Sequence, residues 1–181
     1  PDPRGLSAVG GLEILKDWLK ERQKAFSPAA RAYGLPSPNG SLLVGVPGTG
    51  KSLMAKAVAS AWSLPLLRLD LGALRSKWVG ESEQNIRRAL AVADTVSPAV
   101  IWLDEVEKAL AGSTGPQGDG GVSSDALGVI LSWMQERQGM TFVLATANDI
   151  AGLPPAFLRK GRFDELFWVD LPTSVERREI F

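Results

Sequence analysis

The chain has 181 residues, its 20 Lys and Arg residues are balanced by 20 Asp and Glu residues, and it contains neither histidine nor cysteine. These absences exclude a disulfide framework, a Cys/His zinc site, a cysteine nucleophile and a Ser-His-Asp triad, so catalysis would have to use carboxylates, Lys, Arg, hydroxyls, backbone amides and an oxygen-bound metal such as magnesium. The zero net charge argues against binding nucleic acid by phosphate neutralisation alone, and the longest apolar runs are too short to span a membrane.

Short apolar runs alternate with longer helical patterns along the chain, and Gly and Pro separate them. In chain order we predict a helix over 11–26, a turn over 33–40, a strand over 41–46, a helix over 50–62, a strand over 64–69, a helix over 82–95, a strand over 99–103, a Gly-rich stretch over 112–121, a helix over 123–138 and strands over 141–147 and 166–169. Apolar strands that alternate with helices are typical of a parallel sheet covered on both faces, which predicts an α/β domain.

The whole chain, 1–181, is expected to form one such domain. Residues 174–181 have the pattern of the first turns of a further helix, and the first residue is not Met. We therefore expect the native protein to continue beyond this segment.

A complete phosphate-loop motif follows the first predicted strand. Residues 45–52 read Gly-Val-Pro-Gly-Thr-Gly-Lys-Ser, with a helical pattern after them. Glycines let successive backbone amides point at phosphate oxygens at the start of the helix, the lysine reaches the β- and γ-phosphates, and the hydroxyl ligates magnesium. The motif predicts that ATP phosphates are bound by Pro47, Gly48, Thr49, Gly50, Lys51, Ser52 and Leu53, with Ser52 as a magnesium ligand.

Two carboxylates, Asp104 and Glu105, end the apolar run 99–103. Ligands of an open parallel sheet bind beyond the carboxyl ends of its strands, so these residues are expected near the nucleotide. Asp104 would hold magnesium through water, and Glu105 would polarise the attacking water. The alternative is that Asp104 caps the helix that follows it.

With these motifs, the chain resembles an AAA ATPase module of the AAA+ class over nearly its whole length. The resemblance implies a P-loop NTPase three-layer sandwich with a five-stranded, mostly parallel sheet, namely the large subdomain without its helical lid. Residues 1–10 would form the linker and adenine-contacting segment, and the backbone of residues 8–12, which include Val9 and Gly10, resembles the part that contacts adenine. Asn148, after the strand 141–147, would help to orient the attacking water.

The segment 158–164, Leu-Arg-Lys-Gly-Arg-Phe-Asp, matches the second region of homology of the AAA family. By this resemblance Arg159 and Arg162 are arginine fingers that complete the nucleotide site of a neighbouring subunit, which implies a ring, typically a homohexamer. The alternative is a pair of surface arginines that form local ion pairs with Asp164 or Glu165.

Lys77, Trp78 and Val79 resemble the first pore loop of the family, in which an aromatic residue grips a polypeptide in the ring's channel. The alternative is that Trp78 packs beneath a loop. The stretch 112–121 matches the place of a second pore loop, and a plain flexible loop is an equal alternative. The other five tryptophans lie in apolar or amphipathic stretches and are predicted to pack in the interior: Trp18, Trp62, Trp102, Trp133 and Trp168.

The chain departs from the family pattern in two places. Glu107 stands where a second Asp is usual, and residues 116–119 belong to an unusually Gly-rich insert. Together with the segment 15–26, these features are similar to a cyanobacterial and plastid-encoded AAA branch of poorly defined role.

The function that the motifs and the resemblance predict is binding and hydrolysis of ATP with Mg²⁺, coupled in a full-length ring to remodelling or translocation of a protein substrate through the pore. One alternative is a nucleic-acid motor or loader of the AAA+ class, although nucleic acid is not the expected partner. A second is an ATP-gated scaffold with little turnover. With neither signal peptide nor membrane segment recognised in the sequence, the cytoplasm or the plastid stroma is the expected location.

Overall fold

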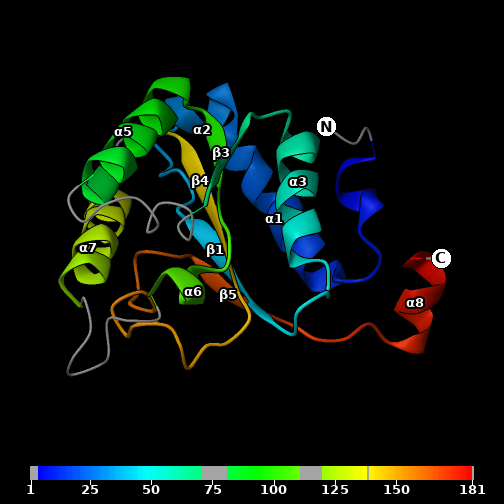
Figure 1. Cartoon of the computed structure of the whole chain (residues 1–181). Helices are drawn as coiled ribbons and strands as arrows, with labels where there is room; N and C mark the ends of the chain where they lie inside the picture. Colours follow the sequence, from blue (N-terminus) through cyan, green and yellow to red (C-terminus); the bar gives the residue numbers. More distant parts are fainter. Residues whose placement is uncertain (1–3, 71–80, 111–119, 138, 181) are drawn as a thin grey trace.

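The computed structural model describes residues 4–70, 81–110, 120–137 and 139–180, which form a five-stranded sheet between two layers of helices (Figure 1). The strand order is β2-β3-β4-β1-β5, and every neighbouring pair is parallel. This confirms the predicted α/β fold. The strands are β1 (Gly40–Gly45), β2 (Leu66–Leu69), β3 (Ala99–Leu103), β4 (Thr141–Ala147) and β5 (Glu165–Val169).

Helices α5 (Glu81–Val96), α6 (Val106–Leu110) and α7 (Gly120–Glu136) lie on one face of the sheet, and α1 (Glu13–Gln23) and α3 (Lys51–Trp62) lie on the other (Figure 1). The helix α8 (Ser174–Ile180) follows β5 and lies beside the N-terminal segment. The remaining short elements are the 3₁₀ turns η1 (Gly5–Ala8) and η2 (Lys24–Phe26) and the helix α2 (Pro28–Ala32).

Two apolar clusters, one on each face of the sheet, hold these layers together. Successive residues of the fully buried strand β4 supply them alternately, because side chains of a strand point to opposite faces. Phe142 faces α3, where its ring meets that of Trp62 edge-on at 4.7 Å between centroids, whereas Val143 faces α5 and α7. The sheet is thus packed on both faces. This packing fixes the positions of the residues that follow the carboxyl ends of its strands.

The structure differs from the predicted elements mainly at helix ends. β3 and β4 have the predicted bounds, whereas the helix expected over 11–26 is α1 followed by the separate turn η2. The pattern also missed α2 and α6. Each is only five residues long, too short to show a helical period.

The prediction that Trp168 packs in the interior is wrong, since 59% of its surface is exposed. β5 is an edge strand, and its residues 166 and 168 pair in register with Leu42 and Val44 of β1, whose side chains face the α5–α7 layer. That layer does not extend over β5 in the described part of the chain. The other four tryptophans are buried or half-buried, as expected.

Within the residues described, we find no helix that is both long enough and apolar enough to cross a lipid bilayer.

Candidate nucleotide site

The loop between β1 and α3 has the backbone conformation that the glycines of the motif predict. Gly48 and Gly50 have φ values of 83° and 90°, in the left-handed region that glycine adopts without strain. An added Cβ at either position would meet no other atom within 4 Å, so the backbone conformation rather than packing requires glycine here. Gly45 is required by packing, because its Cβ would lie 1.9 Å from the carbonyl oxygen of Val169.

Lys51 is the first residue of α3, and its side chain folds back over this loop. It is 6% exposed, and its Nζ donates to the carbonyl oxygens of Gly45 at 2.6 Å and Val46 at 2.7 Å. Burial lowers the pKa of Lys51, and the nearby carboxylates of residues 107, 105 and 104 partly oppose this shift. The next residues, Ser52 and Leu53, are exposed. The helix N-terminus and the lysine together form a positive site that suits phosphate oxygens.

Asp104 directly follows β3 and is held from two sides. Its Oδ1 accepts a hydrogen bond from Thr146 Oγ1 at 2.9 Å, and its Oδ2 accepts one from Arg68 Nη2 at 2.9 Å. Its side chain is 15% exposed. Within the described residues, these side chains rather than an amide of α6 are its hydrogen-bond donors, which speaks against the alternative that Asp104 is a helix cap.

Glu105 has a φ of 48°, unusual for a non-glycine residue, and this turn separates its side chain from that of Asp104. Its Oε2 accepts a hydrogen bond from Lys108 Nζ at 2.7 Å, and its Oε1 accepts one from Asn148 Nδ2 at 3.2 Å. The hydrogen bond from Lys108 is the largest influence that lowers the pKa of Glu105, so the carboxyl group is ionised at neutral pH.

Asn148 donates hydrogen bonds to two of the three carboxylates that follow β3, those of Glu105 and Glu107. Its Nδ2 also donates to Glu107 Oε1 at 3.0 Å, so the residue that departs from the family pattern still takes part in the network. The predicted Asp104, Glu105 and Asn148 are therefore brought together at the carboxyl ends of β3 and β4, although more than forty residues separate the first and last.

A cavity of about 290 Å³ lies between the N-terminal segment, the phosphate loop and α8. Six predicted nucleotide-binding residues line it, and α8 closes it on the far side. Gly10 lies against α8, because an added Cβ would come within 2.5 Å of Ile180 Cγ1. The backbone N–H of Gly11 donates to Glu179 Oε2 at 3.0 Å. The lining residues are Arg4, Ser7, Ala8, Val9, Gly10, Leu12, Gly48, Thr49, Gly50, Leu53, Asp170, Pro172, Glu176, Glu179 and Ile180.

A larger open hollow of about 800 Å³ lies between the α1–α2 region and residues 33–39. It contains none of the phosphate-loop residues and none of the residues of the acidic network. The smaller cavity also has no residue of the acidic network in its lining, but it is lined by Gly48, Thr49 and Gly50, and these phosphate-loop residues identify it as the candidate site.

Arg159 and Arg162 lie at the opposite end of the sheet from the phosphate loop. Their segment contacts the start of β1, where Asn39 Nδ2 donates to the carbonyl oxygen of Gly161 at 3.3 Å. Arg159 is exposed, whereas Arg162 is 7% exposed and its Nε and Nη1 have no hydrogen-bond partner among the described residues. Neither arginine forms an ion pair with Asp164 or Glu165 within the described part of the chain.

The predicted pore-loop residues Lys77, Trp78 and Val79 lie outside the described residues, as do positions 112–119 of the stretch matched to a second pore loop. The last two positions of that stretch begin α7.

Sequence reasoning assigned no role in the acidic network to Arg68, Thr146 or Lys108, although each donates a hydrogen bond to one of its carboxylates. Thr146 could have been noticed as a polar residue near the end of an apolar strand. Arg68 carried a similar signal in β2, as the charged residue of a short apolar run.

The family model of AAA proteins, described as "ATPase family associated with various cellular activities (AAA)", matches residues 41–171, which include the phosphate loop and the acidic network. The chain belongs to the AAA family. The AAA domain is 51% identical over 173 residues to the uncharacterized AAA domain-containing protein ycf46 of Pyropia yezoensis, and the match covers 96% of this chain and 35% of that protein.

Two further relatives are similar over the same region of the AAA domain. The protein of the same name in Guillardia theta is 49% identical over 176 residues, which cover 97% of this chain and 35% of the relative. The cell division cycle protein 48 homolog of Archaeoglobus fulgidus is 35% identical over 178 residues, which cover 96% of this chain and 24% of the relative. The chain thus spans about a third or less of the length of these relatives.

Proposed function

We infer that this AAA domain binds ATP with magnesium and that its full-length protein hydrolyses ATP to ADP and phosphate. The observation that carries the proposal is the acidic network: Asp104 and Glu105 are held in separate orientations by Thr146 and Asn148, at the same sheet edge as a complete phosphate loop. Membership of the AAA family supports a nucleotide as the ligand.

In this proposal the phosphates lie over the loop 46–50 at the start of α3. Lys51 exchanges the carbonyl oxygens of Gly45 and Val46 for phosphate oxygens, which are stronger acceptors because they are charged. The adenine occupies the cavity beside Val9 and Gly10. Ile180 and Leu53 supply apolar surface there.

The donor set fits magnesium bound together with a nucleotide. Within the described residues, no group of three or more acidic side chains forms a metal cage. One carboxylate, Asp104, and one hydroxyl, Ser52, suit an ion that keeps most of its waters and takes its other ligands from phosphates. When bound, magnesium would neutralise phosphate charge as a Lewis acid.

Glu105 has the chemical properties of a general base. It is ionised at neutral pH, as a general base must be, and Asn148 fixes one of its oxygens. We propose that Glu105 accepts a proton from the attacking water and that Asn148 aligns this water.

The position of the arginines supports their action on a neighbouring subunit. Their segment contacts residues 39–40, and the phosphate loop begins at residue 45, about 16 Å away along β1 at about 3.3 Å per residue. Arg159 and Arg162 are thus proposed as fingers of a homohexameric ring. Arg159 is ready to contact a neighbour, whereas Arg162 would first have to turn outward.

Remodelling of a protein substrate, threaded past Lys77, Trp78 and Val79, remains the proposed use of this hydrolysis, with the cytoplasm or plastid stroma as the proposed location. A nucleic-acid motor would instead show an ATPase rate that DNA stimulates. A nucleotide-gated scaffold would bind ATP without turnover.

Nucleotide binding is tested by measuring the affinity of a fluorescent ATP analogue for the wild type, Lys51→Met and Lys56→Met in the presence of magnesium. Lys56 is exposed on the same helix and serves as the matched control. We expect Lys51→Met to weaken binding at least tenfold and Lys56→Met to leave it unchanged. Equal affinity in all three proteins would contradict the proposal.

A further inference from the structure

Arg68 lies beside the carboxylate that the proposed function assigns to magnesium. It belongs to the edge strand β2 and pairs in register with Trp102 of β3, so both side chains lie on the α3 face of the sheet. Asp104 is two residues beyond Trp102 and points to the same face. The guanidinium carbon of Arg68 lies 4.8 Å from the centroid of the Trp102 ring, and its Nη2 donates to Asp104 Oδ2.

The two side chains of this ion pair differ in how far they can move. The Asp104 side chain is 15% exposed, and Thr146 holds its other oxygen, whereas 53% of the Arg68 side chain is exposed. Arg68 can therefore move into solvent while Asp104 keeps its position.

A second carboxylate, that of Asp70, lies near Arg68 just after the end of β2. Asp70 Oδ2 lies 4.0 Å from Arg68 Nη2, and 54% of the Asp70 side chain is exposed. A small rotation of the guanidinium would strengthen the contact with Asp70 and release Asp104. The described residues thus provide an alternative anion for the arginine.

We propose that Arg68 is a counter-ion that competes with magnesium for Asp104 and so raises the magnesium concentration needed to fill the nucleotide site. The proposal rests on the proposed function. The physical reason is that a guanidinium at 2.9 Å from the carboxylate oxygen opposes a second cation at the same group. Binding of the metal then requires that Arg68 leave Asp104, with Asp70 as its new partner.

A purely orienting role for Arg68 predicts the opposite sign. If its main effect were to aim Asp104 at the metal, removal of the guanidinium would weaken magnesium binding. Thr146 already fixes Oδ1, so we expect the loss of the competing charge to dominate. The direction of the change in magnesium dependence distinguishes the two roles.

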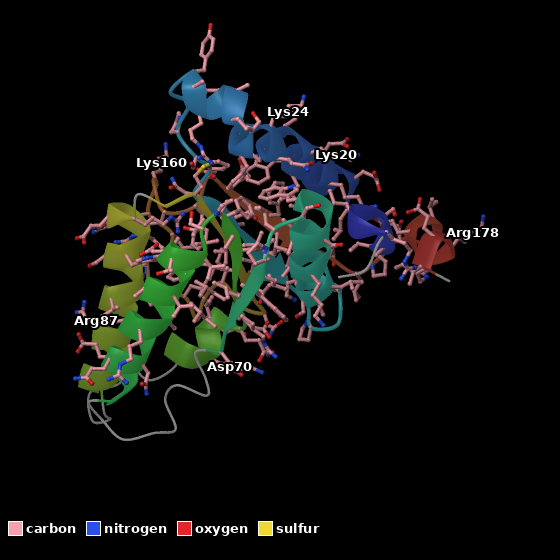
Figure 2. All side chains as sticks on the ribbon, turned by 90° about the horizontal axis from the view of Figure 1, so that it is seen from above. Lys20, Lys24, Asp70, Arg87, Lys160 and Arg178 are labelled. Atoms are coloured by element: carbon pink, nitrogen blue, oxygen red, sulfur yellow. The ribbon has the colours of Figure 1, made fainter. Side chains whose placement is uncertain are left out.

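The experiment measures binding of a fluorescent ATP analogue to the full-length protein. One set of samples contains excess EDTA and no free Mg²⁺, and the others cover a series of free Mg²⁺ concentrations. The variants are Arg68→Gln, Arg68→Lys and Arg87→Gln. Arg87 pairs with Glu83 on α5 and lies away from Asp70, so its variant is the matched control for loss of one positive charge (Figure 2).

In Arg68→Gln the half-saturating Mg²⁺ concentration should fall about fivefold, as expected for loss of one partly exposed charge near the ion. Arg68→Lys keeps the charge and should remain within about twofold of the wild type, as should Arg87→Gln. Melting temperatures measured without nucleotide establish that all variants are folded.

An unchanged or higher half-saturating Mg²⁺ concentration in folded Arg68→Gln, with normal binding by the wild type, would overturn the counter-ion proposal alone. A wild type that binds no nucleotide at any Mg²⁺ concentration would overturn the proposed function and this proposal with it.

Discussion

Thr146 Oγ1 donates a hydrogen bond to Asp104 Oδ1 at 2.9 Å and accepts one from the backbone N–H of Glu105 at 3.2 Å. One buried hydroxyl therefore connects the end of β4 to both carboxylate residues at the end of β3. It fixes the direction of Asp104 and the turn at which the chain leaves the strand. The acidic network thus depends on the pairing of two strands as well as on its own sequence.

Replacement of Thr146 by Val keeps the shape of the side chain but removes its hydrogen bonds. The backbone N–H of Glu105 and one oxygen of Asp104 would lose their partner, so we expect unfolding to require about 1–3 kcal/mol less free energy. Chemical denaturation measures this change. ATP hydrolysis by the full-length protein should also fall, because Asp104 is no longer fixed.

Thr141→Val is the matched control for this change. Thr141 lies on the same strand, is 1% exposed, and its Oγ1 has no hydrogen-bond partner in the described structure. Its replacement should be neutral or stabilising, because it removes a buried polar group that lacks a partner. Equal losses of stability in the two variants would contradict the structural role of the Thr146 hydroxyl.

Arg159→Ala should retain ATP binding in the full-length protein but lower its hydrolysis rate at least a hundredfold, since an arginine finger contributes about three to five powers of ten. Arg162→Ala should have the same direction of effect. Lys160→Ala is the control, because Lys160 is exposed between the two arginines.

A mixture of subunits tests whether the arginine acts on a neighbour. Arg159→Ala subunits retain Glu105, and Glu105→Gln subunits retain Arg159, so mixed rings should recover part of the activity that either variant lacks alone. Absence of recovery in rings shown to be mixed would argue against action between subunits.

The start of α8 should make a pH-dependent contribution to stability through Glu176. The backbone N–H of Thr173 donates to Glu176 Oε2 at 2.7 Å, which is the largest influence that lowers the pKa of this carboxyl below 4.5. A lowered pKa stabilises the folded state above the ordinary pKa, and this contribution is lost as the pH falls through the folded-state value. Thermal melting between pH 6 and pH 3 should therefore show a steeper fall for the wild type than for Glu176→Gln.

Glu21→Gln removes an exposed carboxylate from α1 and should follow the wild-type curve. Parallel curves for the wild type and Glu176→Gln would show that the carboxylate does not make this contribution.

The parts of the fold that could be predicted from the sequence are those with strong local patterns. β3 is apolar throughout, β4 is apolar except for two threonines, and the phosphate loop has its glycines and lysine within the short run 45–51. Trp168 was misplaced because an edge strand and an inner strand have the same apolar pattern. The strand order places β5 at the edge of the sheet, and the exposure of Trp168 shows that no described part of the α5–α7 layer covers it.

The same distinction applies to the site. Lys51, Asp104 and Glu105 belong to local motifs, so their types and spacing were sufficient to predict them. Thr146 and Arg68 reach Asp104 from other strands, 42 and 36 residues away in the sequence. Their contacts depend on which strands are neighbours and in which register, and a single sequence does not specify this.

The central claim is that Glu105 activates water for hydrolysis of bound ATP. The most direct measurement is the release of phosphate from ATP by the full-length protein, with simultaneous measurement of bound nucleotide, in the wild type and in Glu105→Gln. We predict that the wild type turns over ATP, and that Glu105→Gln binds ATP with similar affinity but releases phosphate at least a hundredfold more slowly. Wild-type rates of phosphate release in Glu105→Gln would contradict this claim.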